Sequence, residues 1–196
     1  MRKIFDTAIE ISIVVGAIAL FMHHRNEQEM TKRPSYEGNQ AAIARPIRLD
    51  ETQYKICQTT KVSDGDTIAV DCDGEKLRLR FCGIDAPESK QPLGAESKAL
   101  LSKLVEGKQV IVRPMEQDRY DRTVAEVSVK VGNDEYAHNV NTEMVRTGMA
   151  YHYKQYSSNC PSREAIAEAE DEARSKKIGV WSGDYEKPWE YRKKNR

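Results

Sequence analysis

Apolar and polar residues alternate along three neighbouring stretches in the middle of the chain, residues 54–62, 67–70 and 77–81. This period of two is typical of half-buried β-strands. Asp and Gly residues, which favour turns, lie between the stretches at 63–66 and 73–74. The pattern therefore predicts three strands in a meander.

The following part of the chain mixes helices with strands. Apolar residues at helical spacing predict a helix over residues 95–105, and strands are expected at 109–114 and 123–131. Two further helices are expected at about 139–147 and 162–177. We predict an α+β, mainly β fold: a five-stranded OB-fold barrel with about three helices.

The N-terminus carries an uncharged apolar run over residues 11–22. It is short for a membrane span, which needs about 20 apolar residues, and extending it back to residue 4 brings in Asp6 and Glu10. A signal peptide fits the length, but bulky residues follow the small ones that a cleavage site needs. We predict a signal anchor or signal peptide at 1–24, a helix that engages the membrane through residues 4–22. A helix packed on the domain is the alternative.

A polar stretch follows, and we predict a flexible linker over residues 25–51, a folded domain over 52–183 and a basic tail over 184–196. We expect the tail to be a solvated, frayed terminus. The formal net charge of the 196 residues is zero, and the first fifty residues hold seven of the 31 Lys and Arg against six of the 31 Asp and Glu. Any basic surface that binds nucleic acid must therefore be local.

Acidic residues and one arginine cluster at the predicted strand ends. Asp66, Asp85 and Glu88 could converge on a hard divalent cation, and Arg80 could present a planar fork to a phosphate. The alternative for the motif at 64–66 is a simple hairpin turn.

Five segments in order resemble the staphylococcal nuclease (thermonuclease) family, and together they cover roughly residues 52–183. The resemblance implies an OB-fold domain that hydrolyses DNA with calcium, and RNA is expected as a further substrate. The segments are residues 64–67, 80–88, 118–125, 140–150, and 169–170 with 179–181.

The resemblance also implies a set of calcium ligands. Asp66 and Asp85 carry over as carboxylate ligands, and the carbonyl of Ala86 as a third. The family commonly has Thr at the position of Ala86, but a backbone ligand survives that change. Asp64 is expected to act through a coordinated water.

The remaining roles concern the phosphate and the attacking water. Glu88 carries over as the general base, and Arg80 and Arg122 as the groups that neutralise the phosphate oxygens. Tyr120 matches a contact to the substrate phosphate. Asp121 departs from the Gly that the family usually has, so it either pairs with Arg122 or fills a turn position.

Two further features have alternative explanations. Tyr153 and Lys154 could stack on bases and hold phosphate, as in proteins that bind single strands, or the aromatic residues there could pack on the barrel. Cys57 and Cys72 lie almost opposite each other in a hairpin that turns at Gly65, which makes a disulfide feasible. Buried free thiols are the competing possibility for all four cysteines, including Cys82 and Cys160.

These observations favour a calcium-dependent endonuclease, expected as a monomeric domain anchored to a membrane and facing away from the cytoplasm, or secreted if the N-terminus is cleaved. Two alternatives remain open. One is a module of the same fold that binds nucleic acid without cleaving it, and the other is a tethered structural or partner-binding protein.

Overall fold

The computed structural model describes residues 53–130 and 137–195. The predicted membrane-engaging helix at 4–22 and the linker at 25–51 lie outside these residues. No helix within the described part of the chain is long and apolar enough to cross a membrane.

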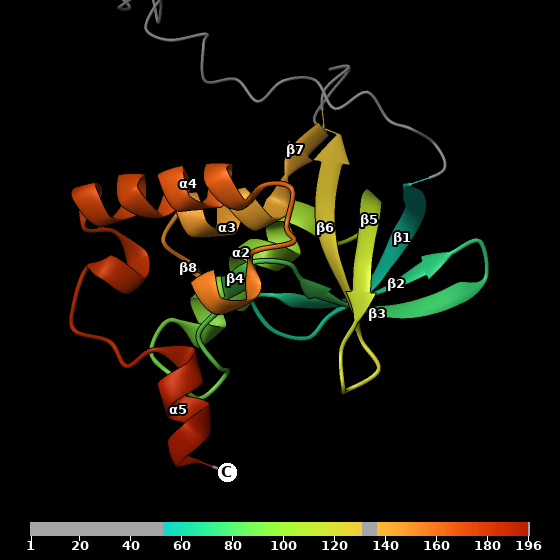
Figure 1. Ribbon diagram of the computed structural model, residues 1–196. Helices are drawn as coiled ribbons and strands as arrows, with labels where there is room; N and C mark the ends of the chain where they lie inside the picture. The colour runs from blue at the N-terminus through green and yellow to red at the C-terminus, as the bar shows by residue number, and fades with distance from the viewer. Residues whose placement is uncertain (1–52, 131–136, 196) are drawn as a thin grey trace, which may run out of the picture. The chain divides into compact units, whose positions relative to one another are not determined.

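Five strands form a closed barrel, as the alternating pattern predicted (Figure 1). They follow the order β3-β2-β1-β5-β6, and all neighbours along this order are antiparallel. Parallel pairing of β3 with β6, from Leu79 opposite Thr123 to Phe81 opposite Ala125, closes the barrel. The strands are β1 (Lys55–Val62), β2 (Thr67–Cys72), β3 (Glu75–Phe81), β5 (Gln109–Gln117) and β6 (Thr123–Lys130).

The described residues also form four α-helices and several short elements. The three predicted helices are α2 (Gly94–Val105), α3 (Val140–Arg146) and α4 (Arg163–Lys176). The fourth helix, α5 (Pro188–Lys194), replaces the frayed terminus expected there. The short elements are β4 (Ile84–Asp85), β7 (Ala137–Asn139), β8 (Tyr151–His152) and the 3₁₀ turns η2 (Lys154–Tyr156) and η3 (Gly179–Trp181).

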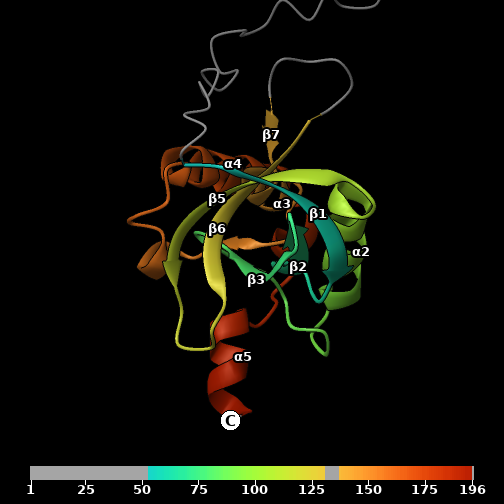
Figure 2. The same ribbon diagram turned by 90° about the vertical axis from the view of Figure 1, so that its right-hand side faces the viewer.

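The hydrophobic core fills the barrel and continues beneath the helices. Leu79 and Val112 are fully buried inside the barrel, and Leu101 of α2, Met144 of α3 and Ile166 of α4 join the same cluster. Figure 2 shows that α5 and the loop between β5 and β6 lie at the same end of the barrel. Packing of the core thus fixes the positions of the strand ends at that end of the barrel.

Two disulfides cross-link the domain. Cys57 pairs with Cys72 across β1 and β2, so the feasible disulfide of the sequence analysis is confirmed. Cys82 pairs with Cys160, which ties the end of β3 to the segment before α4 across 78 residues of sequence. The described residues therefore contain no free thiol.

Asn141 joins α3 to two barrel elements from a fully buried position. Its Oδ1 accepts a hydrogen bond from the Val127 N–H (3.0 Å), and its Nδ2 donates to the carbonyls of Cys82 (2.9 Å) and Ala125 (3.3 Å). The side-chain amide thus provides hydrogen-bond partners for buried backbone groups that are shielded from solvent. It holds the turn after β3 against β6.

We predict that Asn141→Ala lowers the free energy of unfolding by about 3 kcal/mol, because each buried backbone group left without a partner costs about 1–3 kcal/mol. Urea unfolding followed by circular dichroism measures the change. Asn195→Ala, at an exposed position in the last turn of the chain, is the matched control and should stay within about 0.5 kcal/mol of the parent. A loss below about 1 kcal/mol for Asn141→Ala would contradict this role.

Candidate active site

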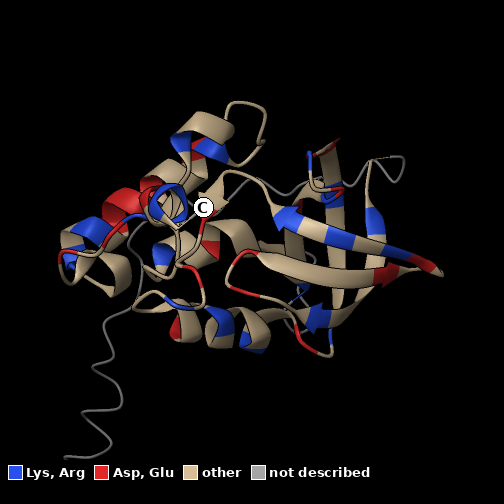
Figure 3. Cartoon of the chain, turned by 90° about the horizontal axis from the view of Figure 1, so that it is seen from below, with Lys and Arg blue, Asp and Glu red and all other residues tan. Residues whose placement is uncertain are grey.

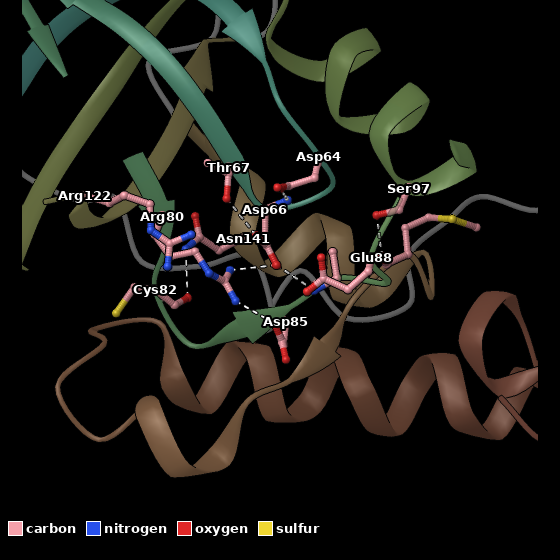
Figure 4. A network of polar contacts seen from close by, with 12 residues as sticks. Asp64, Asp66, Thr67, Arg80, Cys82, Asp85, Glu88, Ser97, Arg122 and Asn141 are labelled. Atoms are coloured by element: carbon pink, nitrogen blue, oxygen red, sulfur yellow. Dashed lines mark hydrogen bonds and ion pairs between the residues drawn. The ribbon is translucent and has the colours of Figure 1, made fainter. Parts of the chain in front are cut away.

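A single guanidinium joins two buried carboxylates at one end of the barrel (Figure 4). Arg80 Nη1 lies 2.7 Å from Asp66 Oδ2, and its Nη2 donates to Asp85 Oδ1 at 2.6 Å. The Asp85 side chain has no exposed surface, and that of Asp66 is only 8% exposed. Burying ionised carboxylates requires such a partner, since desolvation otherwise strongly disfavours the charge.

Strand geometry explains why these three residues meet. Arg80 near the end of β3 pairs in register with Thr67 at the start of β2, so Asp66 lies beside it. The Phe81 N–H donates to the Asp66 carbonyl at 2.9 Å. Asp85 follows in β4, one tight turn after β3. The meander itself therefore builds the pair of carboxylates.

Gly65 lets the turn before Asp66 lie close to α2. A Cβ atom at this position would stand 1.9 Å from Ser97 Oγ and 2.7 Å from the Ala86 Cβ. Asp64 closes the turn, because its Oδ1 accepts a hydrogen bond from the Asp66 N–H at 3.0 Å. The motif at 64–66 is thus a turn and also a part of the site, so the two explanations are not exclusive.

The loop after β4 places Glu88 at the edge of the same site. The Ala86 N–H donates to Asp66 Oδ2 at 2.7 Å, and the Glu88 N–H donates to Gln91 Oε1 at 2.9 Å. Gly94 allows α2 to start against this loop, since a Cβ there would stand 2.1 Å from the Glu88 carbonyl oxygen. Glu88 therefore projects from a rigid loop, with its side chain 34% exposed.

Arg122 approaches from the loop between β5 and β6, where Asp118 holds it. Its Nη2 and Nε lie 2.7 Å and 2.8 Å from Asp118 Oδ2. Asp118 Oδ1 accepts hydrogen bonds from the N–H groups of Tyr120 and Arg122. Burial works to raise the pKa of Asp118, but the hydrogen bonds from Arg122 and the backbone outweigh it and lower the pKa.

Asp121 fills a turn position, which corrects the idea that it restrains Arg122. Its φ is +57°, a left-handed conformation that Asp tolerates and Gly adopts without cost. The ion-pair partner of Arg122 among the described residues is Asp118. Sequence reasoning looked at the neighbouring acid and missed the one four residues earlier, although an aspartate that begins a turn often bonds to backbone N–H groups two residues on.

Most of these residues line one cleft of about 990 Å³, but the fully buried Asp85 is not among the lining residues. Asp64, Asp66, Glu88 and both arginines border it, together with Tyr120 and Tyr153. Tyr120 is 58% exposed. Lys154 is not among the lining residues, and its Nζ lies 3.5 Å from Glu170 with the side chain 69% exposed.

The C-terminal helix supplies residues that the sequence analysis did not assign to the site. Trp189 and Arg192 of α5 line the cleft, and Arg192 contacts both Asp85 and Glu88. Figure 3 looks onto this end from below and shows Lys and Arg residues of α5 around the C-terminus. The basic cluster in the tail was visible in the sequence, but nothing there indicated what it would contact.

The acidic side of the cleft is electrostatically crowded. Burial, and then the charge of Asp66, raise the pKa of Asp64 to about 6. A second carboxylate close by disfavours ionisation, so a cation would relieve the repulsion.

The donor atoms fit a hard divalent cation in their chemistry. No group of three or more His, Cys, Asp and Glu residues converges as a metal cluster within the described part of the chain. The carboxylates converge on guanidinium groups instead: Asp66 and Asp85 on Arg80, and Asp85 and Glu88 on Arg192. All the donor atoms are oxygens, the ligand type that calcium takes, and they already face a positive charge.

The amino-acid sequence is similar to those of known proteins. Residues 78–183, more than half of the chain, match the family described as staphylococcal nuclease homologue. A micrococcal nuclease of Shigella flexneri is 35% identical over 140 residues, which cover 69% of this chain and 79% of that protein. The chain belongs to the staphylococcal nuclease family.

Two other relatives are longer than the part that matches this chain. A staphylococcal-like nuclease of Arabidopsis thaliana is 42% identical over 123 residues, 62% of this chain and 35% of that protein. An uncharacterized endonuclease of Haemophilus influenzae is 40% identical over 127 residues, 64% of this chain and 66% of that protein. The chain thus spans between about a third and two thirds of the length of these relatives.

The part that matches the staphylococcal nuclease family does not contain the whole site. Arg80, Asp85, Glu88 and Arg122 lie inside residues 78–183, whereas Asp66 precedes them. The contacts of Asp66 with Arg80 and the Ala86 N–H connect it to the matched part. Helix α5 lies beyond the match on the other side.

His152, on the strand that pairs with the strand of Asp85, should make the free energy of unfolding depend on pH. His152 pairs with Ile84 between β8 and β4, and burial lowers its pKa although Glu170 opposes this. Above the unfolded-state pKa of about 6.5 both states are neutral and the stability is complete. As the pH falls below that value the unfolded state binds the proton more readily, so stability declines.

We therefore predict that the parent loses more stability than His152→Gln between pH 7.5 and pH 5.5. Thermal unfolding at the two pH values measures both proteins, and the variant removes the contribution of this one group. Equal losses in the two proteins would show that His152 is not the source.

Proposed function

We propose that this protein is a calcium-dependent phosphodiesterase, an endonuclease that hydrolyses DNA and also RNA. The observation that carries the proposal is the joining of Asp66 and Asp85 by Arg80, with Glu88 and Arg122 bordering the same cleft. Relatives named as nuclease and endonuclease support the same reaction class.

Asp66, Asp85 and the Ala86 carbonyl would hold the calcium ion, with Asp64 acting through a water. When bound, the ion would supply positive charge to the phosphate and favour ionisation of a water. Arg80 and Arg122 neutralise the phosphate oxygens, where charge grows in the transition state. Tyr120, exposed at the edge of the cleft, contacts the substrate phosphate.

Glu88 acts as the general base. One of its carboxylate oxygens takes a proton from the attacking water, whose oxygen forms a bond to phosphorus while one phosphorus–oxygen ester bond breaks. The leaving oxygen departs with the bonding electrons as an alkoxide and takes up a proton from solvent. Its side chain is partly exposed, so a water molecule from solvent can reach it. The hydrogen bond from the Glu88 N–H to the Gln91 side chain fixes the backbone from which the carboxylate extends.

We also propose that the domain works outside the cytoplasm, held by the N-terminal segment. Two disulfides support this, since disulfides persist in oxidising compartments and are rare where thiols are kept reduced.

Digestion of plasmid and single-stranded DNA and of RNA by the full chain, with calcium and with excess chelator, tests the function. Cleavage that requires calcium is the expected result. Binding without cleavage would instead favour a module that only binds nucleic acid, and full activity in chelator would overturn the role of calcium.

The base assignment gives a prediction about rate. Glu88→Gln should lower kcat by about 10²–10⁴-fold, the usual size of general-base catalysis. Steady-state cleavage of an oligonucleotide measures it, with Glu96→Gln on α2, which does not line the cleft, as the control. Cleavage within a few-fold of the parent would remove Glu88 from this role.

The ligand assignment gives a prediction about metal. Asp66→Asn and Asp85→Asn each remove one anionic ligand, so each should raise the calcium concentration needed for half-maximal activity. Because Asp85 is completely buried beside two arginines, unfolding curves of the variants must accompany the titration. An unchanged calcium requirement in folded variants would argue against these ligands.

The loop between β5 and β6 gives a prediction that distinguishes the role of Asp118 from that of Asp121. Asp118→Asn should lower kcat/KM by about three- to tenfold, because the pair that orients the Arg122 guanidinium is lost while the amide can still accept the two backbone hydrogen bonds. Asp121→Gly should leave kcat/KM within about twofold. A gain for Asp121→Gly at low salt would restore the idea that Asp121 restrains the arginine.

A further inference from the structure

Helix α5 places a guanidinium between a proposed metal ligand and the proposed base. Arg192 Nη2 donates to Asp85 Oδ2 at 2.7 Å, and its Nη1 donates to Asp85 Oδ1 at 3.1 Å and to Glu88 Oε1 at 2.7 Å. The Asp85 side chain is completely buried, whereas Arg192 is 36% exposed and reaches it from the surface. The arginine is thus a removable partner of a fixed carboxylate.

Aromatic and polar contacts dock α5 at this position. The Trp189 ring stacks on Tyr153 with centroids 5.2 Å apart and planes at 5°, and it meets the edge of Tyr151 at 5.8 Å. Just before the helix, the Glu186 carbonyl accepts a hydrogen bond from Gln91 Nε2 at 2.9 Å. The stacked aromatic pair, the hydrogen bond from Gln91 and the salt bridges of Arg192 therefore hold the helix in place.

These contacts use the groups that the proposed reaction needs. Both oxygens of Asp85 and one of Glu88 are bonded to Arg192, so they cannot serve a cation and an attacking water at the same time. Trp189 covers one face of Tyr153, where a base would otherwise stack.

We propose that α5 is an autoinhibitory helix in which Arg192 stands in for a divalent cation between Asp85 and Glu88. The cation and the nucleic acid bind fully only when α5 has left the cleft. The proposal rests on the proposed function, because it assigns α5 a role at that same site.

The energetics allow such a switch. A helix of seven residues is too short to persist in water once its packing is lost, so undocking also unfolds it and the docked state depends on the contacts above. A ligand that binds only the open state has its apparent dissociation constant raised by the inverse of the open fraction. An open fraction of about 1–10% would weaken calcium binding by about 10–100-fold.

The test measures calcium binding to the full chain by isothermal titration calorimetry, without substrate. Arg192→Met keeps an unbranched apolar stem but removes the guanidinium and its charge, so it should tighten calcium binding by about tenfold or more. Arg192→Lys keeps the charge but loses the two-pronged bond, and should tighten binding by less. Lys193→Met removes a charge from an exposed neighbour on the same helix and should leave the affinity unchanged.

A second measurement follows the helix itself. Amide hydrogen exchange over residues 188–194 should be slow in the calcium-free parent and should speed up when calcium is added. Trp189→Ala should speed it up without calcium and should tighten calcium binding as well.

The outcomes separate this proposal from the proposed function. Tighter calcium binding in Arg192→Met without cleavage of any nucleic acid would support autoinhibition by α5 and contradict the proposed nuclease activity. Unchanged calcium affinity in both Arg192 variants, a calcium-bound parent with α5 still protected, or no calcium binding by any variant would overturn the autoinhibition. A fall in kcat for Arg192→Met at unchanged calcium affinity would instead make Arg192 part of the catalytic machinery.

Discussion

A carboxylate without exposed surface needs a positive charge beside it, and Asp85 imposes that requirement on the rest of the domain. β4 and β8 hold its backbone, Arg80 reaches it from β3, and Arg192 reaches it from the far end of the chain. Because a buried pair that loses one partner is strongly destabilised, Asp85 needs a cation beside it whenever it is ionised. The identity of that cation can differ between states of the protein.

The proposed function requires a chain with no net charge to bind an anionic polymer. Acidic residues line the cleft together with arginines from the strands and from the β5–β6 loop, including Arg78, Arg119 and Arg122. The positive charge is local, as the neutral composition requires. Attraction of this kind acts over about 10 Å at moderate salt, a range comparable with the dimensions of a cleft.

Local sequence patterns determined the barrel and much of the site. Alternation located the strands, and Asp66, Arg80 and Asp85 lie where those strands end, so their meeting follows from the meander. The strands β4 and β8 have two residues each, too few to produce a pattern. The role of Asp118 and the docking of α5 depend on contacts made through space. Arg192 lies 107 residues from Asp85, and no spacing rule connects them.

The disulfide between Cys82 and Cys160 sets an order of events in the life of the chain. Cys82 immediately precedes the turn that leads to Asp85, and its partner is made only after most of the domain has been synthesised. During translation the carboxylate strand therefore exists for a long interval without its covalent brace, without β8 and without α5. A chain that has not yet been extended to α5 holds most of the chemical groups of the site but lacks the contacts that Arg192 makes with them.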